Sequence, residues 1–183
     1  MTTLDTASRT ERIAAALSRL RAALASRPEL GRGKVSTSVA HLTEGVRCVV
    51  HEHGFTVESD LPAPLGGDDA APSPSALVRA ALGACLAMGY QLRAAEAGIA
   101  LDAVRVTVVS ESDVRGLLGP GTDEPPGFAA LEYHVEIDSA ASADELTRLI
   151  DLGDLHSPVL DMLTRAHTVG RTVTFGPLAT AGA

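Results

Sequence analysis

The chain has 183 residues, of which 45% are hydrophobic and 21% charged, and its net charge is −8. This balance excludes intrinsic disorder of the whole chain, and an acidic chain without a basic run is a poor candidate for binding nucleic acid. The N-terminus lacks the order of a secretory signal, and no apolar run reaches the ~18 residues that a membrane helix needs. We therefore expect one cytoplasmic domain with no nucleic-acid or membrane partner.

In the first third of the chain the spacing of apolar residues changes from helical to alternating. Residues 8–26 carry an apolar stripe at helical spacing that ends before Pro28, which predicts an N-terminal helical extension over residues 1–33. From residue 34 to 59 apolar and polar residues alternate, with turns at Glu44-Gly45 and Gly54. This pattern predicts three short antiparallel strands. A loop rich in Pro, Gly and Asp follows up to residue 74.

A long central helix is predicted next. Ser73 is a typical N-cap and Pro74 suits the first helical position, and the apolar pattern continues to about Ala97, where Gly98 ends it. Many residues along this segment are Ala or Gly, so another element can approach closely. A helix this apolar and small-sided is expected at the centre of a fold.

The second half predicts strands over residues 101–111 and 129–138, separated by a long Gly/Pro loop at 114–127 that could act as a lid. Two helices follow, from Ser142 to about Leu155 and from Ser157-Pro158 to about Ala166. A last strand is expected over residues 168–175, then a flexible tail over 177–183. The order of elements predicts an α+β domain over residues 34–176.

The two cysteines, Cys48 and Cys85, cannot form a disulfide framework, and their spacing is not that of a zinc site. Cys85 lies three turns into the central helix, beyond the reach of the helix dipole, and the residues one turn on either side are uncharged. From the residues alone, Cys85 is interpreted as a buried structural cysteine. A reactive thiolate there would need stabilisation from another segment.

The histidine pair His51 and His53 could supply two metal ligands from one strand face, with His41 or Asp60 as a third. The alternative, an exposed polar strand face, is favoured. The chain also lacks a P-loop and a dinucleotide-binding fingerprint. We expect no metal and no cofactor.

Several short segments, taken together, resemble the OsmC/Ohr family over roughly residues 34–175, which leaves the N-terminal helix outside. The late-helix junction Ser157-Pro158-Val159 is one of them. The others are Asp60-Leu61-Pro62, Gly66-Gly67, Pro72-Ser73-Pro74, Ala80-Ala81-Leu82-Gly83-Ala84-Cys85 and Glu96-Ala97-Gly98-Ile99.

The resemblance implies an OsmC-like fold, with antiparallel sheets around a long central helix, in an intertwined homodimer with active sites at the subunit interface. It also implies reduction of organic hydroperoxides by two cysteines. In such proteins a thiolate on the central helix attacks the peroxide, and a second cysteine near the late helices closes a disulfide. An Arg and a Glu help to set up the attacking thiolate.

Carried over residue by residue, the resemblance places Cys85 at the attacking position and Arg47 as the candidate Arg. The resolving position falls on Ser157, which cannot form a disulfide, and the Glu position falls on Ser75. His156 precedes Ser157 and could line the same pocket.

These departures leave three alternatives for the chemistry: a one-Cys peroxidase resolved by an external thiol, a cycle that uses Cys48, or a scaffold that has lost the reaction. The leading hypothesis is thiol-dependent reduction of organic hydroperoxides in oxidative-stress defence, with Cys85 as nucleophile. The alternative hypothesis is a non-catalytic homodimer that binds a small apolar ligand in the interface pocket. A third is a dimer without small-molecule chemistry. The N-terminal helix is expected to cap the dimer or cover the pocket.

Overall fold

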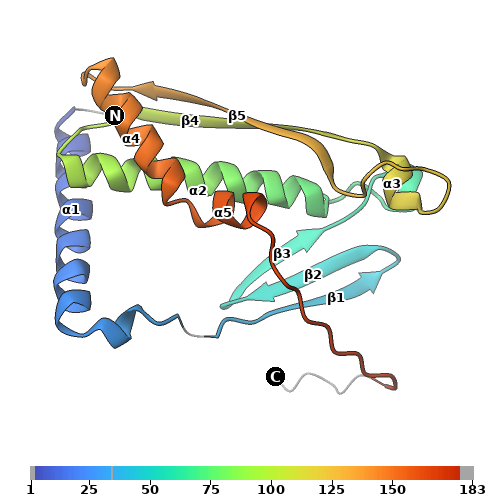
Figure 1. Cartoon of the computed structure of the whole chain (residues 1–183). Coiled ribbons are helices and arrows are strands. Elements are labelled where there is room, and N and C mark those ends of the chain that lie inside the picture. Colours follow the sequence, from blue (N-terminus) through green and yellow to red (C-terminus); the bar gives the residue numbers. More distant parts are fainter. Residues whose placement is uncertain (1–2, 34, 178–183) are drawn as a thin grey trace.

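The computed structural model describes residues 3–33 and 35–177, so all but the first residue of the expected tail lies outside the described residues. The N-terminal helix is confirmed as α1 (Thr3–Ser26), followed by a short 3₁₀ turn, η1 (Pro28–Gly31). An ion pair between Arg21 and Glu96 ties α1 to the end of the central helix. Figure 1 shows α1 lying across that end.

The three expected strands form an antiparallel sheet in chain order: β1 (Ser38–Glu44), β2 (Arg47–Glu52) and β3 (Phe55–Ser59). His53 and Gly54 join β2 to β3 with φ values of 46° and 80°. Positive φ at both central residues is the geometry of a type I′ hairpin turn, which Gly favours. The first strand begins at Ser38, a few residues later than expected.

The central helix is confirmed as α2 (Pro74–Ala97). The Ser73 hydroxyl accepts a hydrogen bond from the Ala76 N–H, and Gly98 ends the helix with φ of 70°. By length and composition alone α2 could cross a membrane, with a mean hydropathy of 1.2, although Arg79 and Arg93 interrupt its apolar residues. Its buried residues instead form the core of this fold, because Leu82, Leu86 and Tyr90 are fully enclosed.

The second sheet is an antiparallel pair, β4 (Ala103–Ser112) and β5 (Phe128–Asp138). Half-buried and exposed residues alternate along both strands, as expected when one face covers a helix. That helix is α2, where a Cβ on Gly83 would lie 3.4 Å from the Val108 Cγ2 atom. The small residues of α2 therefore allow the close approach that the sequence predicted.

The segment between β4 and β5 is not wholly a loop, since it contains the short helix α3 (Val114–Leu118). Asp113 initiates this helix by accepting a hydrogen bond from the Arg115 N–H, a local signal that the Gly/Pro content of the segment masked. The two late helices are confirmed as α4 (Ala143–Leu155) and α5 (Pro158–Thr164). Figure 1 shows α4 crossing α2 on the way to α5.

The strand expected over residues 168–175 is wrong for the single chain. Residues 165–177 form no helix or strand, and Val169 and Phe175 are almost fully exposed. The alternating pattern is present, but a strand needs a neighbouring strand for its backbone hydrogen bonds, and the described part of the chain offers none at this place.

Candidate functional site

The structure brings together two residues that are 72 positions apart in the sequence. The Cys85 Sγ atom lies 3.3 Å from the Ser157 Oγ atom. Cys85 comes from the middle of α2, and Ser157 is the N-cap of α5. The thiol is half-buried, whereas Ser157 is 3% exposed. The attacking and resolving positions implied by the resemblance are therefore in contact, with a hydroxyl where a second thiol would stand.

The Ser157 hydroxyl is oriented by its capping role. Its oxygen accepts a hydrogen bond from the Leu160 N–H at 3.3 Å. A hydroxyl has one donor hydrogen besides its acceptor lone pairs, so that hydrogen remains available for the sulfur. A thiolate can only accept, and Ser157 would therefore donate to the ionised form of Cys85. Ser157 is therefore the hydrogen-bonding group from another segment that lies nearest to Cys85 among the described contacts.

Arg47, the candidate cation, is engaged elsewhere in the single chain. It begins β2 and its guanidinium lies 2.5 Å from the Glu58 carboxylate on β3. The hydrogen bond and the charge of Glu58 raise the pKa of Arg47. Within the described residues no hydrogen bond or ion pair joins Arg47 to Cys85, and its role at the thiolate stays a prediction.

Among the described residues, none of the other residues assigned to the site forms a hydrogen bond with Cys85. Cys48 is on β2, and both cysteines are free. Ser75 is exposed at the start of α2, ten residues or about 15 Å of helix from Cys85. His156 ends α4 beside Ser157, and its side chain is exposed.

Asp60 has a structural role that explains part of the resemblance. Its carboxylate, on a residue 2% exposed, accepts hydrogen bonds from the N–H groups of Leu61, Asp68 and Ala70 at 2.8, 3.1 and 3.1 Å. These bonds, with that from Ala70 the largest cause, lower the pKa of Asp60. Gly67 is required in this loop, because a Cβ there would lie 1.8 Å from the Leu61 carbonyl oxygen. The loop is thereby fixed where it leads into α2.

The histidines and the aspartate proposed as metal ligands are not arranged as a metal site. His53 lies in the β2–β3 turn rather than on the strand face with His51, and it is His41 on β1 that stacks on His51, with ring centroids 5.4 Å apart. Asp60 is already occupied by backbone N–H groups. Among the described residues no three His, Cys, Asp or Glu side chains gather in a group that could hold a metal ion.

The sequence interpretation missed a buried polar contact beside the site. The carboxylate of Asp154 on α4 accepts hydrogen bonds from the hydroxyls of Tyr90 on α2 and Tyr133 on β5, at 2.6 and 2.7 Å. Burial, followed by the bond to Asp154, raises the pKa of Tyr133 to about 12, and the same causes raise the pKa of Tyr90 further. The available signal was a tyrosine on the buried central helix, since a buried phenol needs a hydrogen-bond partner.

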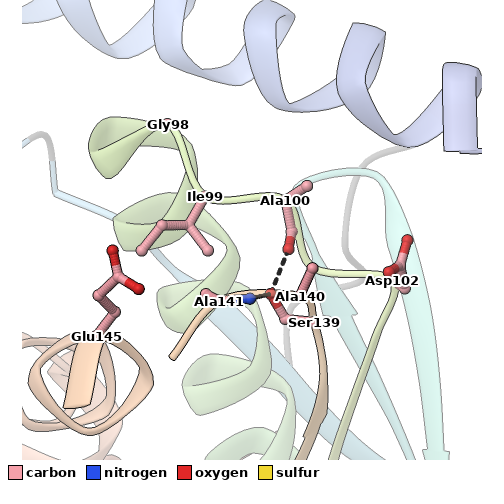
Figure 2. A pocket seen from close by; sticks show the side chains of 8 residues that line it. All are labelled: Gly98, Ile99, Ala100, Asp102, Ser139, Ala140, Ala141 and Glu145. Atoms are coloured by element: carbon pink, nitrogen blue, oxygen red, sulfur yellow. Dashed lines mark hydrogen bonds between the residues drawn. The ribbon is translucent and has the colours of Figure 1, made fainter. Parts of the chain in front are cut away.

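A surface pocket at the far end of α2 is separate from Cys85. Figure 2 shows it between the turn after α2 and the turn after β5. The Ser139 hydroxyl donates to the Ala100 carbonyl at 2.7 Å and accepts from the Ala141 N–H, so its polar groups are already paired. The charged residues of the lining, Asp102 and Glu145, are both acidic, and no thiol lines the pocket. We assign it no chemistry.

Comparison with solved structures identifies the fold. An OsmC-like protein from Mycoplasma pneumoniae is 22% identical with a TM-score of 0.61, covering 72% of this chain and 89% of that one. Organic hydroperoxide resistance proteins from Legionella pneumophila and Elizabethkingia anophelis are 20% and 23% identical, each with a TM-score of 0.55. Both cover 73% of this chain, and 91% and 90% of their own chains. These similarities show an OsmC-like α+β fold.

Family membership follows from the sequence, independently of these structures. No curated protein matches the sequence. The family model for OsmC-like protein matches residues 66–170, more than half of the chain, and that segment contains both Cys85 and Ser157. The chain therefore belongs to the OsmC-like protein family.

Proposed function

We propose that the protein serves in peroxide defence as a one-Cys reductase of organic hydroperoxides, with Cys85 as the attacking thiolate and an external thiol as the reductant. The observation that carries the proposal is the contact of Cys85 Sγ with Ser157 Oγ at 3.3 Å. It combines a half-buried thiol with a hydroxyl donor at the place where a second thiol would otherwise stand. Relatives of similar fold that are named organic hydroperoxide resistance proteins support the substrate class.

The first step oxidises Cys85 by two electrons. The thiolate attacks the outer oxygen of the hydroperoxide, an S–O bond forms and the O–O bond breaks. The leaving alkoxide takes up a proton and departs as the alcohol, while Cys85 becomes a sulfenic acid. Ser157 donates its hydrogen bond to the thiolate before the attack.

The second step differs from that of a two-Cys enzyme. A sulfenic acid condenses with a thiol to a disulfide and releases water. Ser157 cannot do this, and Cys48 is a free cysteine on a different element from Cys85. An external thiol therefore forms a mixed disulfide with Cys85, and a second thiol molecule releases reduced Cys85 together with the oxidised reductant.

The proposal includes a homodimer and a cytoplasmic setting. Large apolar side chains are exposed both on the β1–β3 sheet and around the Cys85 face of α2 and α4, which is typical of an interaction surface. A second subunit covering them would supply an apolar pocket for the hydroperoxide, and its Arg47 is our candidate for the missing cation. The most exposed of these side chains are Leu42, Phe55, Met88 and Leu155.

Hydroperoxide consumption tests the proposal. With dithiothreitol as the external thiol, we expect the protein to consume cumene hydroperoxide catalytically and Cys85→Ser to fall to the background rate. Cys48→Ser is the matched control, and because Cys48 takes no part in the cycle its rate should equal that of the unaltered protein. A rate unaffected by Cys85→Ser would refute the assignment of the nucleophile.

A second candidate function is non-catalytic binding of a small apolar ligand in the subunit interface. One observation favours it: within the described chain no cation pairs with Cys85, and Arg47 is held by Glu58. Native mass spectrometry of the purified protein separates the two functions. A co-purifying apolar ligand together with a Cys85 that is inert to hydroperoxide would favour binding.

A further inference from the structure

A buried hydrogen-bonded group links the helix that carries Cys85 to the helix that precedes Ser157. Tyr90 is on α2 and fully buried, and its hydroxyl donates to one oxygen of the Asp154 carboxylate at 2.6 Å. The other oxygen accepts from Tyr133 on β5 at 2.7 Å. The two tyrosines are the only ones in the sequence. We call these three residues the tyrosine–aspartate clamp.

The clamp connects directly to the turn that carries Ser157. The backbone carbonyl of Asp154 accepts the Ser157 N–H at 3.1 Å, so the residue held by the two phenols also fixes the Ser157 backbone. Ser157 is three positions after Asp154, and Tyr90 is five positions, about one and a half helical turns, after Cys85. The clamp thus lies within two turns of the sulfur–hydroxyl contact along both segments.

The packing beside the clamp leaves little freedom. A Cβ on Gly153 would lie 2.5 Å from the Tyr90 ring, so α4 approaches α2 as closely as a glycine permits. A charge-assisted hydrogen bond is shorter and stronger than a neutral one and has a narrower geometry. The buried Tyr90 ring and the two short hydrogen bonds to the Asp154 carboxylate therefore fix the position of α4 on α2.

We propose that Tyr90 and Asp154 are positioning residues that hold the Ser157 hydroxyl against the Cys85 sulfur. The inference rests on the proposed function, since it concerns the thiolate at the same site. Neither residue contacts Cys85 through a hydrogen bond within the described chain, and both act through Ser157. Tyr133 completes the clamp from the sheet side.

The test uses alkylation of Cys85 by iodoacetamide, which reports on the thiolate without requiring a peroxide. In a Cys48→Ser background, Ser157→Ala should slow alkylation at neutral pH by about tenfold and shift the pH–rate profile to higher pH, because a donor to the charged sulfur is lost. Tyr90→Phe removes only the phenolic hydroxyl and should slow alkylation in the same direction. Asp154→Asn, which keeps an acceptor, should have a smaller effect than Asp154→Ala.

A double-mutant cycle separates positioning from loss of stability. If Tyr90 acts through Ser157, Tyr90→Phe should add almost nothing in the Ser157→Ala background. Leu101→Ala, a core change two residues before β4, is the control that lowers the melting temperature without slowing alkylation. Equal slowing by Tyr90→Phe in both backgrounds, or no slowing by Ser157→Ala, would overturn the proposal. Coupling without hydroperoxide consumption would instead retain the clamp and refute the proposed function.

Discussion

The contact between Cys85 and Ser157 determines what this site can and cannot do. An engineered thiol at position 157 would start from an atom 3.3 Å from the Cys85 sulfur. A disulfide requires a sulfur–sulfur distance near 2.05 Å and Cα atoms within about 7 Å. Because the two side-chain ends are already in contact, we expect a cysteine at position 157 to form this bond.

We predict that Ser157→Cys forms an intramolecular disulfide with Cys85 on treatment with hydroperoxide. The intact mass should fall by the two hydrogens lost when the bond closes, and peptide mapping should join α2 to the start of α5. Turnover should then proceed with a dithiol. A disulfide between Cys48 and Cys85 in place of this bond would show that positions 85 and 157 do not meet in solution.

At the scale of the elements, signals local to the chain gave the most reliable predictions. The bounds of α2 could be predicted to the residue because Ser73, Pro74 and Gly98 act through their immediate neighbours. The strand at 168–175 could not, because pairing requires a distant partner that no local pattern supplies. The same limit applied to the site: only the family resemblance aligned Cys85 with Ser157, and Asp154 was missed altogether.

The clamp between α2, α4 and β5 gives the protein a defined response to alkaline pH. Tyr133, whose pKa is raised to about 12, titrates near 10 in an unfolded chain. The free energy of unfolding that protonated Tyr133 contributes is therefore fully present below pH 10 and is lost as the pH rises through about 12. Because both tyrosines of the chain are in the clamp, absorbance at 295 nm should show almost no tyrosinate in the folded protein at pH 10.5.

Denaturant unfolding gives the second readout of this prediction. The free energy of unfolding should decline between pH 10 and 12, and Tyr133→Phe should flatten that decline. Normal titration of both tyrosines near pH 10 with the fold intact would contradict the buried clamp.

At the scale of the whole molecule, the exposed apolar surface is typical of an interaction surface. Much of the β1–β3 sheet and the Cys85 side of the α2–α4 layer are uncovered in one chain. The N-terminal helix α1 lies at the end of α2 about 18 Å of helix from Cys85, so within one chain it does not cover the thiol. Its expected role as a cap on the dimer stays a prediction.

We predict a dimer in sedimentation equilibrium. Leu155, 75% exposed at the end of α4, should be covered in that dimer, and Leu155→Glu should shift the protein to monomers because it would bury a charge. Leu30→Glu, an equally drastic change in the N-terminal extension outside the family match, tests the expected capping role separately, because an unchanged dimer would rule that role out. A monomeric unaltered protein would contradict the proposed interface pocket.

If Cys85 is a nucleophile towards hydroperoxide, it passes through a sulfenic acid that can be trapped. The protein is exposed briefly to cumene hydroperoxide with a sulfenic-acid trap present, and its intact mass is compared with that of Cys85→Ser. We predict a trapped adduct on Cys85 that forms much faster than on free cysteine and is absent from the variant. A loss of two hydrogens to a Cys48–Cys85 disulfide would contradict the one-Cys cycle, and an unmodified Cys85 would contradict its assignment as the nucleophile.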